Sequence, residues 1–119
     1  MRRKDRQRTC AFAQQVLDAC MYATLAMTDM QGRPYCVPIN PVREGDALYF
    51  HAAMEGKKTD CLRNNPAVCI AAVGRTRVPA GKFTMQYESA IATGRAEEVT
   101  DTEMKIHALR LLCQKFAPA

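Results

Sequence analysis

Two adjacent lysines, Lys57 and Lys58, follow Gly56 at the predicted start of a short helix. The first amide groups of a helix have no intrahelical acceptor, and the helix dipole places partial positive charge there. Unpaired N–H groups, a glycine that lets the backbone approach and two ammonium groups together indicate a phosphate-binding turn. Two solvated surface lysines are the alternative interpretation of the same pattern.

His51 precedes this turn and stands at the end of a predicted strand, directly after Tyr49 and Phe50. The histidine is either a structural residue or a functional one beside the phosphate-binding turn. Its charge changes near neutral pH, which would suit proton delivery or an electrostatic hold on a reduced cofactor. The other histidine, His107, lies in the predicted last helix, where we expect a surface or half-buried position.

The elements that position these residues follow from apolar spacing and from the turn residues between them. We expect helices over 10–20, 57–64 and from about 100 to 116, the last opened by a capping-box spacing over 100–103. Strands are expected over 21–28, 33–42, 47–51, 67–74 and 83–93, with a bend at Gly94 and a continuation over 95–99. Strands joined mostly by hairpins predict a mainly β (α+β) domain, in which an antiparallel sheet curls into a barrel with flanking helices.

Two of these strands have unusual compositions. The segment 33–42 places Tyr35, Val37 and Ile39 on one face but contains Pro38 and Pro41, so we expect an edge or bulged strand. Irregular strands of this kind often line a ligand site. The segment 67–74 is almost entirely apolar, which predicts a strand buried on both faces.

The bulk composition is that of one domain covering residues 1–119, with a basic arm over residues 1–8. The net charge of +5 would suit a nucleic-acid-binding module, but the arm lacks interleaved aromatic residues that stack on bases. We therefore expect neither a nucleic-acid partner nor a membrane, because no apolar stretch approaches the ~20 residues of a membrane span.

The cysteines are expected to be free thiols in a reducing compartment. Without an export signal at the N-terminus we expect a cytoplasmic protein with free thiols. No CxxC pair occurs and histidines are few, so we expect no metal site. Cysteines in apolar runs, Cys36, Cys69 and Cys113, are expected to behave as small hydrophobic residues. The six cysteines are Cys10, Cys20, Cys36, Cys61, Cys69 and Cys113.

Taken in order, segments 1–6, 32–40, 48–58, 63–66, 83–89 and 94–98 resemble the nitroimidazole-resistance (Nim) proteins, within the pyridoxamine 5′-phosphate oxidase-like group. The resemblance implies an antiparallel, Greek-key-like split β-barrel that binds FMN between the subunits of a homodimer. Relatives usually continue into another strand after the last helix, so the resemblance implies that this final strand is missing before Ala119.

The resemblance also implies a set of cofactor-binding residues. One strand would run along the isoalloxazine ring: Cys36, Val37, Pro38, Ile39 and Asn40. The ribityl phosphate would be held by His51, Ala52, Lys57 and Lys58, next to Gly56. Ser89 would reach the flavin from the second subunit, with Tyr87 and Glu88 beside it.

The function that this site predicts is an FMN-dependent oxidoreductase. It would pass electrons or hydride from reduced flavin to a small oxidised acceptor, nitroimidazoles and other nitro-aromatic compounds among them, with His51 as the catalytic residue. A non-catalytic flavin-binding or sensing protein is the alternative. A haem or deazaflavin binder is a further one, because a fold does not fix its ligand.

Overall fold

The computed structural model describes residues 10–52, 55–77 and 86–117. The elements in chain order are α1 (Cys10–Ala19), β1 (Ala23–Thr28), β2 (Pro34–Ile39), β3 (Val42–Glu44), β4 (Ala47–Tyr49), α2 (Lys57–Asn64), β5 (Ala67–Arg77), β6 (Gln86–Arg95) and α3 (Thr102–Phe116).

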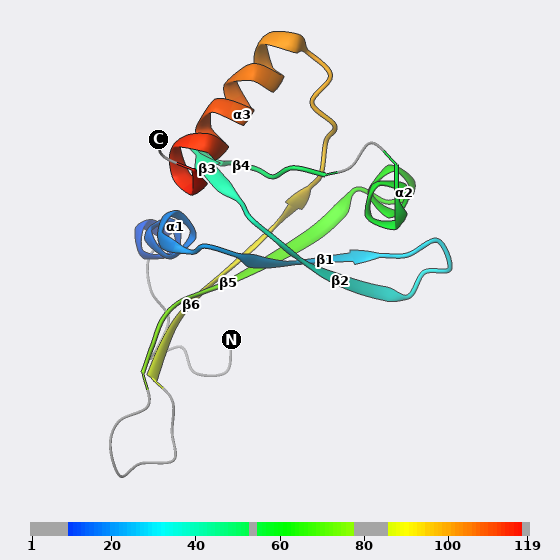
Figure 1. Cartoon of the computed structure of the whole chain (residues 1–119). Helices are drawn as coiled ribbons and strands as arrows, with labels where there is room; N and C mark the ends of the chain where they lie inside the picture. Colours follow the sequence, from blue (N-terminus) through cyan, green and yellow to red (C-terminus); the bar gives the residue numbers. More distant parts are fainter. Residues whose placement is uncertain (1–9, 53–54, 78–85, 118–119) are drawn as a thin grey trace.

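The strands form a four-stranded antiparallel sheet in the order β2-β1-β5-β6 and a separate hairpin of β3 and β4 (Figure 1). The predicted edge position of the proline-containing strand is confirmed, since β2 pairs only with β1 within the described chain. An edge strand tolerates Pro38, opposite Thr24, because a missing N–H on the open side breaks no ladder bond.

The hydrophobic core lies on one face of the four-stranded sheet. Leu25 and Ile70 point into it from β1 and β5, Val16 and Leu17 cover it from α1, and Cys61 covers it from α2. The helices and the β3–β4 hairpin all lie on this side of the sheet, with α3 outermost (Figure 1). The described residues leave the opposite face of the sheet uncovered.

The predicted strand 33–42 is two strands. It breaks after Ile39, and Val42 begins β3 in the other sheet. Pro41 has no N–H to continue a ladder, and the Asn40 side chain donates to the Met21 carbonyl at 2.7 Å, which fixes the change of direction. The next strand is also shorter than predicted, because β4 ends at Tyr49.

The expectation that the apolar strand is buried on both faces is wrong. In β5, Ile70 and Ala72 are buried, whereas Ala71 and Val73 are exposed. The composition indicated two-sided burial, but the helices and the hairpin in the described part of the chain cover one face only. Gly94 also produces no bend, because it pairs regularly with Val68, and β6 ends at Arg95 without the predicted continuation. Residues 83–85 of the predicted strand lie outside the described residues.

The helices follow the predictions closely at α1 and α2, and less closely at α3. The N-cap of α3 is Asp101, whose carboxylate accepts from the Met104 N–H at 3.0 Å, so the predicted capping box from Thr100 does not form. Ile106 and Leu109 are exposed, and Ala108 is the buried residue of this helix.

The positions of the thiols also differ from expectation. Cys20 and Cys61 are the buried ones, whereas Cys36 and Cys113 are exposed and Cys69 is half-buried. All five are free thiols, in agreement with the sequence-based expectation for these positions.

Candidate functional site

The N-terminus of α2 begins directly after Gly56, whose φ of +145° is reached without strain only by glycine. No side chain caps this end of the helix. The Lys57 Nζ lies 4.3 Å from the centroid of the Tyr35 ring, and the Lys58 Nζ lies 5.9 Å from that of Phe50. The two ammonium groups are therefore held over aromatic faces at an uncapped helix end.

Charge around α2 is arranged so that these lysines stay unpaired with protein carboxylates. Among the described residues, no Asp or Glu forms an ion pair with Lys57 or Lys58. Arg63, in the last turn, instead pairs with Glu98 at 2.9 Å, and this hydrogen bond raises the pKa of the guanidinium. That pair ties α2 to the chain that follows β6.

A hollow of about 460 Å³ lies where β2 and β4 end against the last turns of α3. Two residues predicted for the site, Asn40 and His51, are brought together in its wall. The Asn40 amide is fixed there by its 2.7 Å bond to the Met21 carbonyl. The lining residues are Asn40, His51, Leu112, Cys113, Phe116 and Ala117.

The open edge of β2 connects the two features. Lys57 lies over Tyr35 at one end, and Asn40 lines the hollow at the other. Five residues of extended chain at roughly 3.3 Å each separate the two ends by about 17 Å. Of the predicted residues between them, Cys36 and Pro38 are exposed, whereas Val37 and Ile39 face the core. Val37 and Ile39 therefore offer a ligand on this edge only their backbone.

The other predicted residues lie elsewhere. Ala52 is half-buried directly after His51. Ser89 is exposed on β6, opposite Val73 of β5, and Tyr87 and Glu88 precede it on the same strand. Because β6 and β2 are opposite edges of the sheet, one chain does not bring these three residues to the β2 edge.

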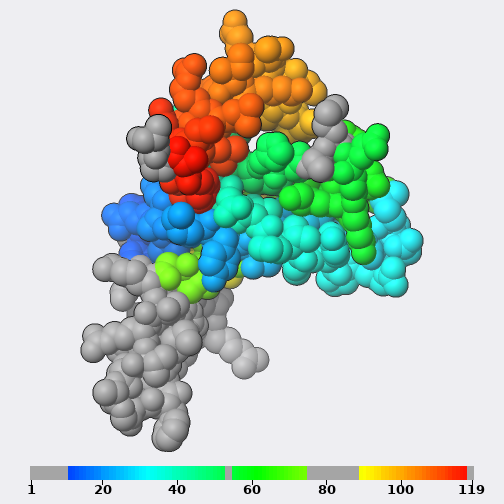
Figure 2. All heavy atoms as spheres, viewed as in Figure 1, coloured from blue at the N-terminus to red at the C-terminus, as the bar shows by residue number. Residues whose placement is uncertain are grey.

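Sequence reasoning missed the wall of the hollow that α3 supplies. Leu112, Cys113 and Phe116 are far from His51 in the sequence, and their apolar spacing indicates only a helix face. Figure 2 shows α3, orange to red, standing above the hairpin atoms in cyan and green. The contact depends on tertiary packing, so no local signal could have predicted it.

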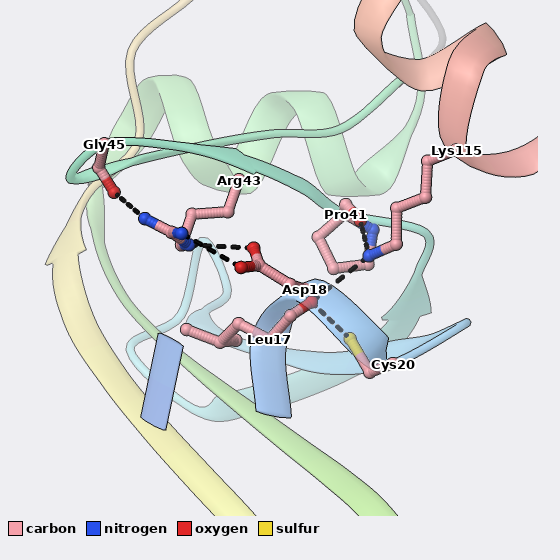
Figure 3. A network of polar contacts seen from close by, with 7 residues as sticks. All are labelled: Leu17, Asp18, Cys20, Pro41, Arg43, Gly45 and Lys115. Atoms are coloured by element: carbon pink, nitrogen blue, oxygen red, sulfur yellow. Dashed lines mark hydrogen bonds and ion pairs between the residues drawn. The ribbon is translucent and has the colours of Figure 1, made fainter. Parts of the chain in front are cut away.

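A polar network holds α1, β3 and α3 together beside this wall (Figure 3). The Arg43 guanidinium donates to both oxygens of Asp18, at 2.8 and 2.9 Å, which raises the pKa of Arg43. The Lys115 ammonium donates to the carbonyls of Leu17, at 3.1 Å, and Pro41, at 2.8 Å. Burial lowers the pKa of Lys115, although the Cys20 thiol and Asp18 oppose this shift.

The described part of the chain holds neither a cluster of metal-ligating side chains nor a membrane-spanning helix. No three side chains among its histidines, cysteines, aspartates and glutamates gather closely enough to hold a metal ion. None of its helices is long and apolar enough to cross a membrane.

Together, the antiparallel four-stranded sheet, the separate β3–β4 hairpin and the helices on one side of the sheet form a split β-barrel. Flavin-related oxidoreductases belong to this class of fold. The sequence places the chain within that class more closely. Residues 11–119 match the model of the pyridoxamine 5′-phosphate oxidase family, and the chain belongs to this family.

Solved structures with the same fold include flavoproteins. A candidate 5-nitroimidazole antibiotic resistance protein from Bacteroides thetaiotaomicron is 29% identical with a TM-score of 0.85, over 95% of this chain and 69% of its own. The flavocytochrome Anf3 from Azotobacter vinelandii is 25% identical with a TM-score of 0.78, over 95% of this chain and 54% of its own. An FAD-binding protein from Mesorhizobium loti is 27% identical with a TM-score of 0.71, over 90% of this chain and 75% of its own.

An uncharacterized protein from Rhizobium meliloti strain 1021 is 33% identical over 87 residues, which are 70% of this chain and 53% of that protein. The chain thus spans about half the length of this relative. These matches establish the family and the fold.

Proposed function

We propose that this chain is an FMN-binding oxidoreductase that passes electrons to a small oxidised acceptor, with nitroimidazoles and other nitro-aromatic compounds as the first class to test. The observation that carries the proposal is the open edge of β2, which joins the lysines at the α2 N-terminus to the hollow lined by Asn40 and His51. Similarity to the Bacteroides protein supports the choice of acceptor.

The residues present fit a flavin mononucleotide. Its phosphate matches the uncapped start of α2, where amide groups and the ammonium groups of Lys57 and Lys58 meet. Its ring would lie along Cys36, Pro38 and Asn40 on the β2 edge, between the lysine end and the hollow. When bound, FMN supplies the capacity to accept and release electrons.

The protein's own residues bind the cofactor and orient the acceptor. In this proposal Lys57 and Lys58 neutralise the phosphate, and the Asn40 amide, fixed by Met21, shapes the ring end of the pocket. His51 stands in the hollow, where its imidazole can donate a proton to an acceptor that gains electrons. The apolar side chains of Leu112 and Phe116 give the acceptor a surface on which an aromatic ring can pack.

A second copy of the chain completes the site in this proposal. The open face of the sheet carries two large exposed apolar side chains, Val73 (53% exposed) and Ile91 (71% exposed). Exposed apolar groups of this kind are typical of an interaction surface. Ser89 lies on β6 opposite Val73, two residues before Ile91 and on the same face, so a partner docked there would carry its own Ser89 toward the first chain's β2 edge.

The visible absorption spectrum of the purified protein tests the proposal, followed by titration with FMN and FAD. We expect the purified protein to show flavin absorption bands. If the protein is colourless, added FMN should bind to it, with a shift of the FMN absorption bands and quenching of the FMN fluorescence. The second step is reduction of a nitroimidazole by chemically reduced holoprotein. Absence of any flavin binding would overturn the proposed function.

A non-catalytic flavin-binding protein is the second candidate. It is favoured by the small number of titratable groups in the hollow, where only His51 and Cys113 are present among the lining residues. Stoichiometric FMN binding without reduction of any nitro-aromatic acceptor would select this candidate over the enzyme.

A further inference from the structure

Lys115 connects the two sides of the hollow without lining it. Its neighbour Phe116 belongs to the α3 wall, and Pro41 follows Asn40 of the opposite wall. The Lys115 Nζ donates to the Pro41 carbonyl at 2.8 Å. This hydrogen bond links the two walls, because each of its two residues is next in sequence to a lining residue. A second bond, 3.1 Å to the Leu17 carbonyl, anchors the same ammonium to the last turn of α1 (Figure 3).

Among the described residues, Lys115 supplies the side-chain hydrogen bonds at this end of α3, where Leu111, Leu112 and Phe116 are half-buried. Ala108 is its only buried residue within the described chain, and Ile106 and Leu109 are about half exposed. The other polar contacts lie toward the N-terminal half of the helix, where the His107 Nε2 pairs with a Glu44 carboxylate oxygen at 2.7 Å. The C-terminal half depends on Lys115 for its hydrogen-bonded link to the sheet side of the molecule.

The partners of Lys115 explain why an ammonium is used here. Leu17 presents its carbonyl at the C-terminal end of α1, where the helix dipole is negative and a cation is favourable. The amine keeps two acceptors although it is partly buried, because the carbonyls replace the water it loses. Methionine has a similar length but no donor, so it would lose both bonds.

We propose that Lys115 is a positioning residue, which holds the last turn of α3 against the Asn40–Pro41 link and thereby sets the width of the hollow around His51. The inference rests on the proposed function only where the hollow is taken as the acceptor pocket. Lys115 itself touches neither the flavin nor the acceptor in this arrangement.

The first experiment needs no cofactor. Wild type, Lys115→Met, Lys115→Arg and the matched control Lys105→Met, an exposed lysine of the same helix, are treated with diethyl pyrocarbonate. The modification rate of His51 is followed by peptide mass spectrometry. His51 is exposed in the wild type, so we expect a rise of only about twofold in Lys115→Met, as the α3 wall moves away after both hydrogen bonds are lost, and a rate near wild type in Lys115→Arg and Lys105→Met.

The second experiment uses the FMN-loaded protein. Lys115→Met should raise the KM for a nitro-aromatic acceptor about fivefold, while kcat and the Kd for FMN stay near wild type, and Lys115→Arg should restore the KM. Should Lys115→Met fail to fold, Lys115→Gln, which keeps one donor group, takes its place with the same expected directions.

An unchanged His51 rate in folded Lys115→Met or Lys115→Gln overturns the positioning role, and so does an unchanged KM in the same variant when its rate does rise. A wild-type protein that binds no FMN or reduces no acceptor instead overturns the proposed function. In that case the modification rates of His51 still decide whether Lys115 sets the width of the hollow.

Discussion

Ser89 and Cys36 point to the same face of the four-stranded sheet from its opposite edges. Cys36 lies in one cross-strand row with Ala26, Cys69 and Thr93, and Ser89 lies four residues before Thr93 on β6 and therefore on the same face. Three strand spacings of ~4.8 Å place the two edges about 14 Å apart. If Ser89 contacts a ligand on the β2 edge, it therefore does so from a second chain.

Ile91→Asp should separate the chains if the open sheet face is the dimer interface. Ile91 is 71% exposed in one chain, so the substitution removes little packing from the monomer but places a carboxylate in the interface. We expect the mass measured by light scattering to halve and FMN affinity to fall at the same time.

Leu109→Asp is the matched control for this surface, since Leu109 is a large apolar residue of α3 that is 49% exposed but lies off the sheet. Its mass and FMN affinity should remain those of the wild type. A wild-type protein that is already monomeric yet binds FMN tightly would contradict the two-chain site.

Replacement of both Lys57 and Lys58 by alanine should weaken FMN binding at least about tenfold, because two charge-assisted contacts to the phosphate are lost. The measurement is fluorescence titration with FMN. Riboflavin, which lacks the phosphate, should bind the double variant and the wild type equally well. The exposed α3 pair Lys105→Ala and Arg110→Ala controls for the loss of net positive charge. Equal FMN affinity in all three proteins would place the phosphate elsewhere.

Asp29 stabilises the turn between β1 and β2. Its carboxylate accepts from the backbone N–H groups of Gln31 and Arg33, each at 2.9 Å, and the bond from the Arg33 N–H is the main cause of its lowered pKa. The unfolded value is about 3.9, so the stabilisation is present above that pH and is lost as pH falls toward the lower folded value.

Asp29→Asn should therefore lower the Tm by a few degrees at neutral pH and flatten the fall in Tm on acidification below pH ~4. Thermal unfolding followed by circular dichroism at several pH values measures both effects. Asp46→Asn, in the exposed turn of the β3–β4 hairpin, is the comparison variant. An Asp29→Asn curve that runs parallel to the wild-type curve would show that the turn hydrogen bonds do not depend on this charge.

The sequence predicted the elements whose causes are local. The bounds of α2 follow from Gly56 before it and Pro66 after it, and the edge position of β2 follows from its prolines. What it missed depends on partners distant in the chain. The apolar run of β5 could not reveal that only one of its faces is covered, because the covering helices are set by tertiary packing.

The candidate site likewise has one part that the sequence predicted and other parts that it did not. The phosphate-binding turn was predictable because glycine, helix start and lysines are neighbours in the chain. The pairing of His51 with Asn40 in one hollow required the fold, and the α3 wall with Lys115 gave no signal in its own segment. A lysine near a helix end is common, and only the positions of the Leu17 and Pro41 carbonyls distinguish this one.

His51→Gln separates catalysis from cofactor binding. Glutamine keeps hydrogen-bonding capacity in the hollow but cannot deliver a proton as imidazolium does, so we expect kcat for a nitro-aromatic acceptor to fall about a hundredfold or more. The Kd for FMN, measured by fluorescence, should change by only a few fold. His107→Gln provides the comparison, because His107 pairs with Glu44 outside the hollow and its loss should leave kcat unaltered. A His51→Gln protein that turns over as fast as the wild type would exclude the imidazole as the proton donor and would leave the hollow as a binding pocket alone.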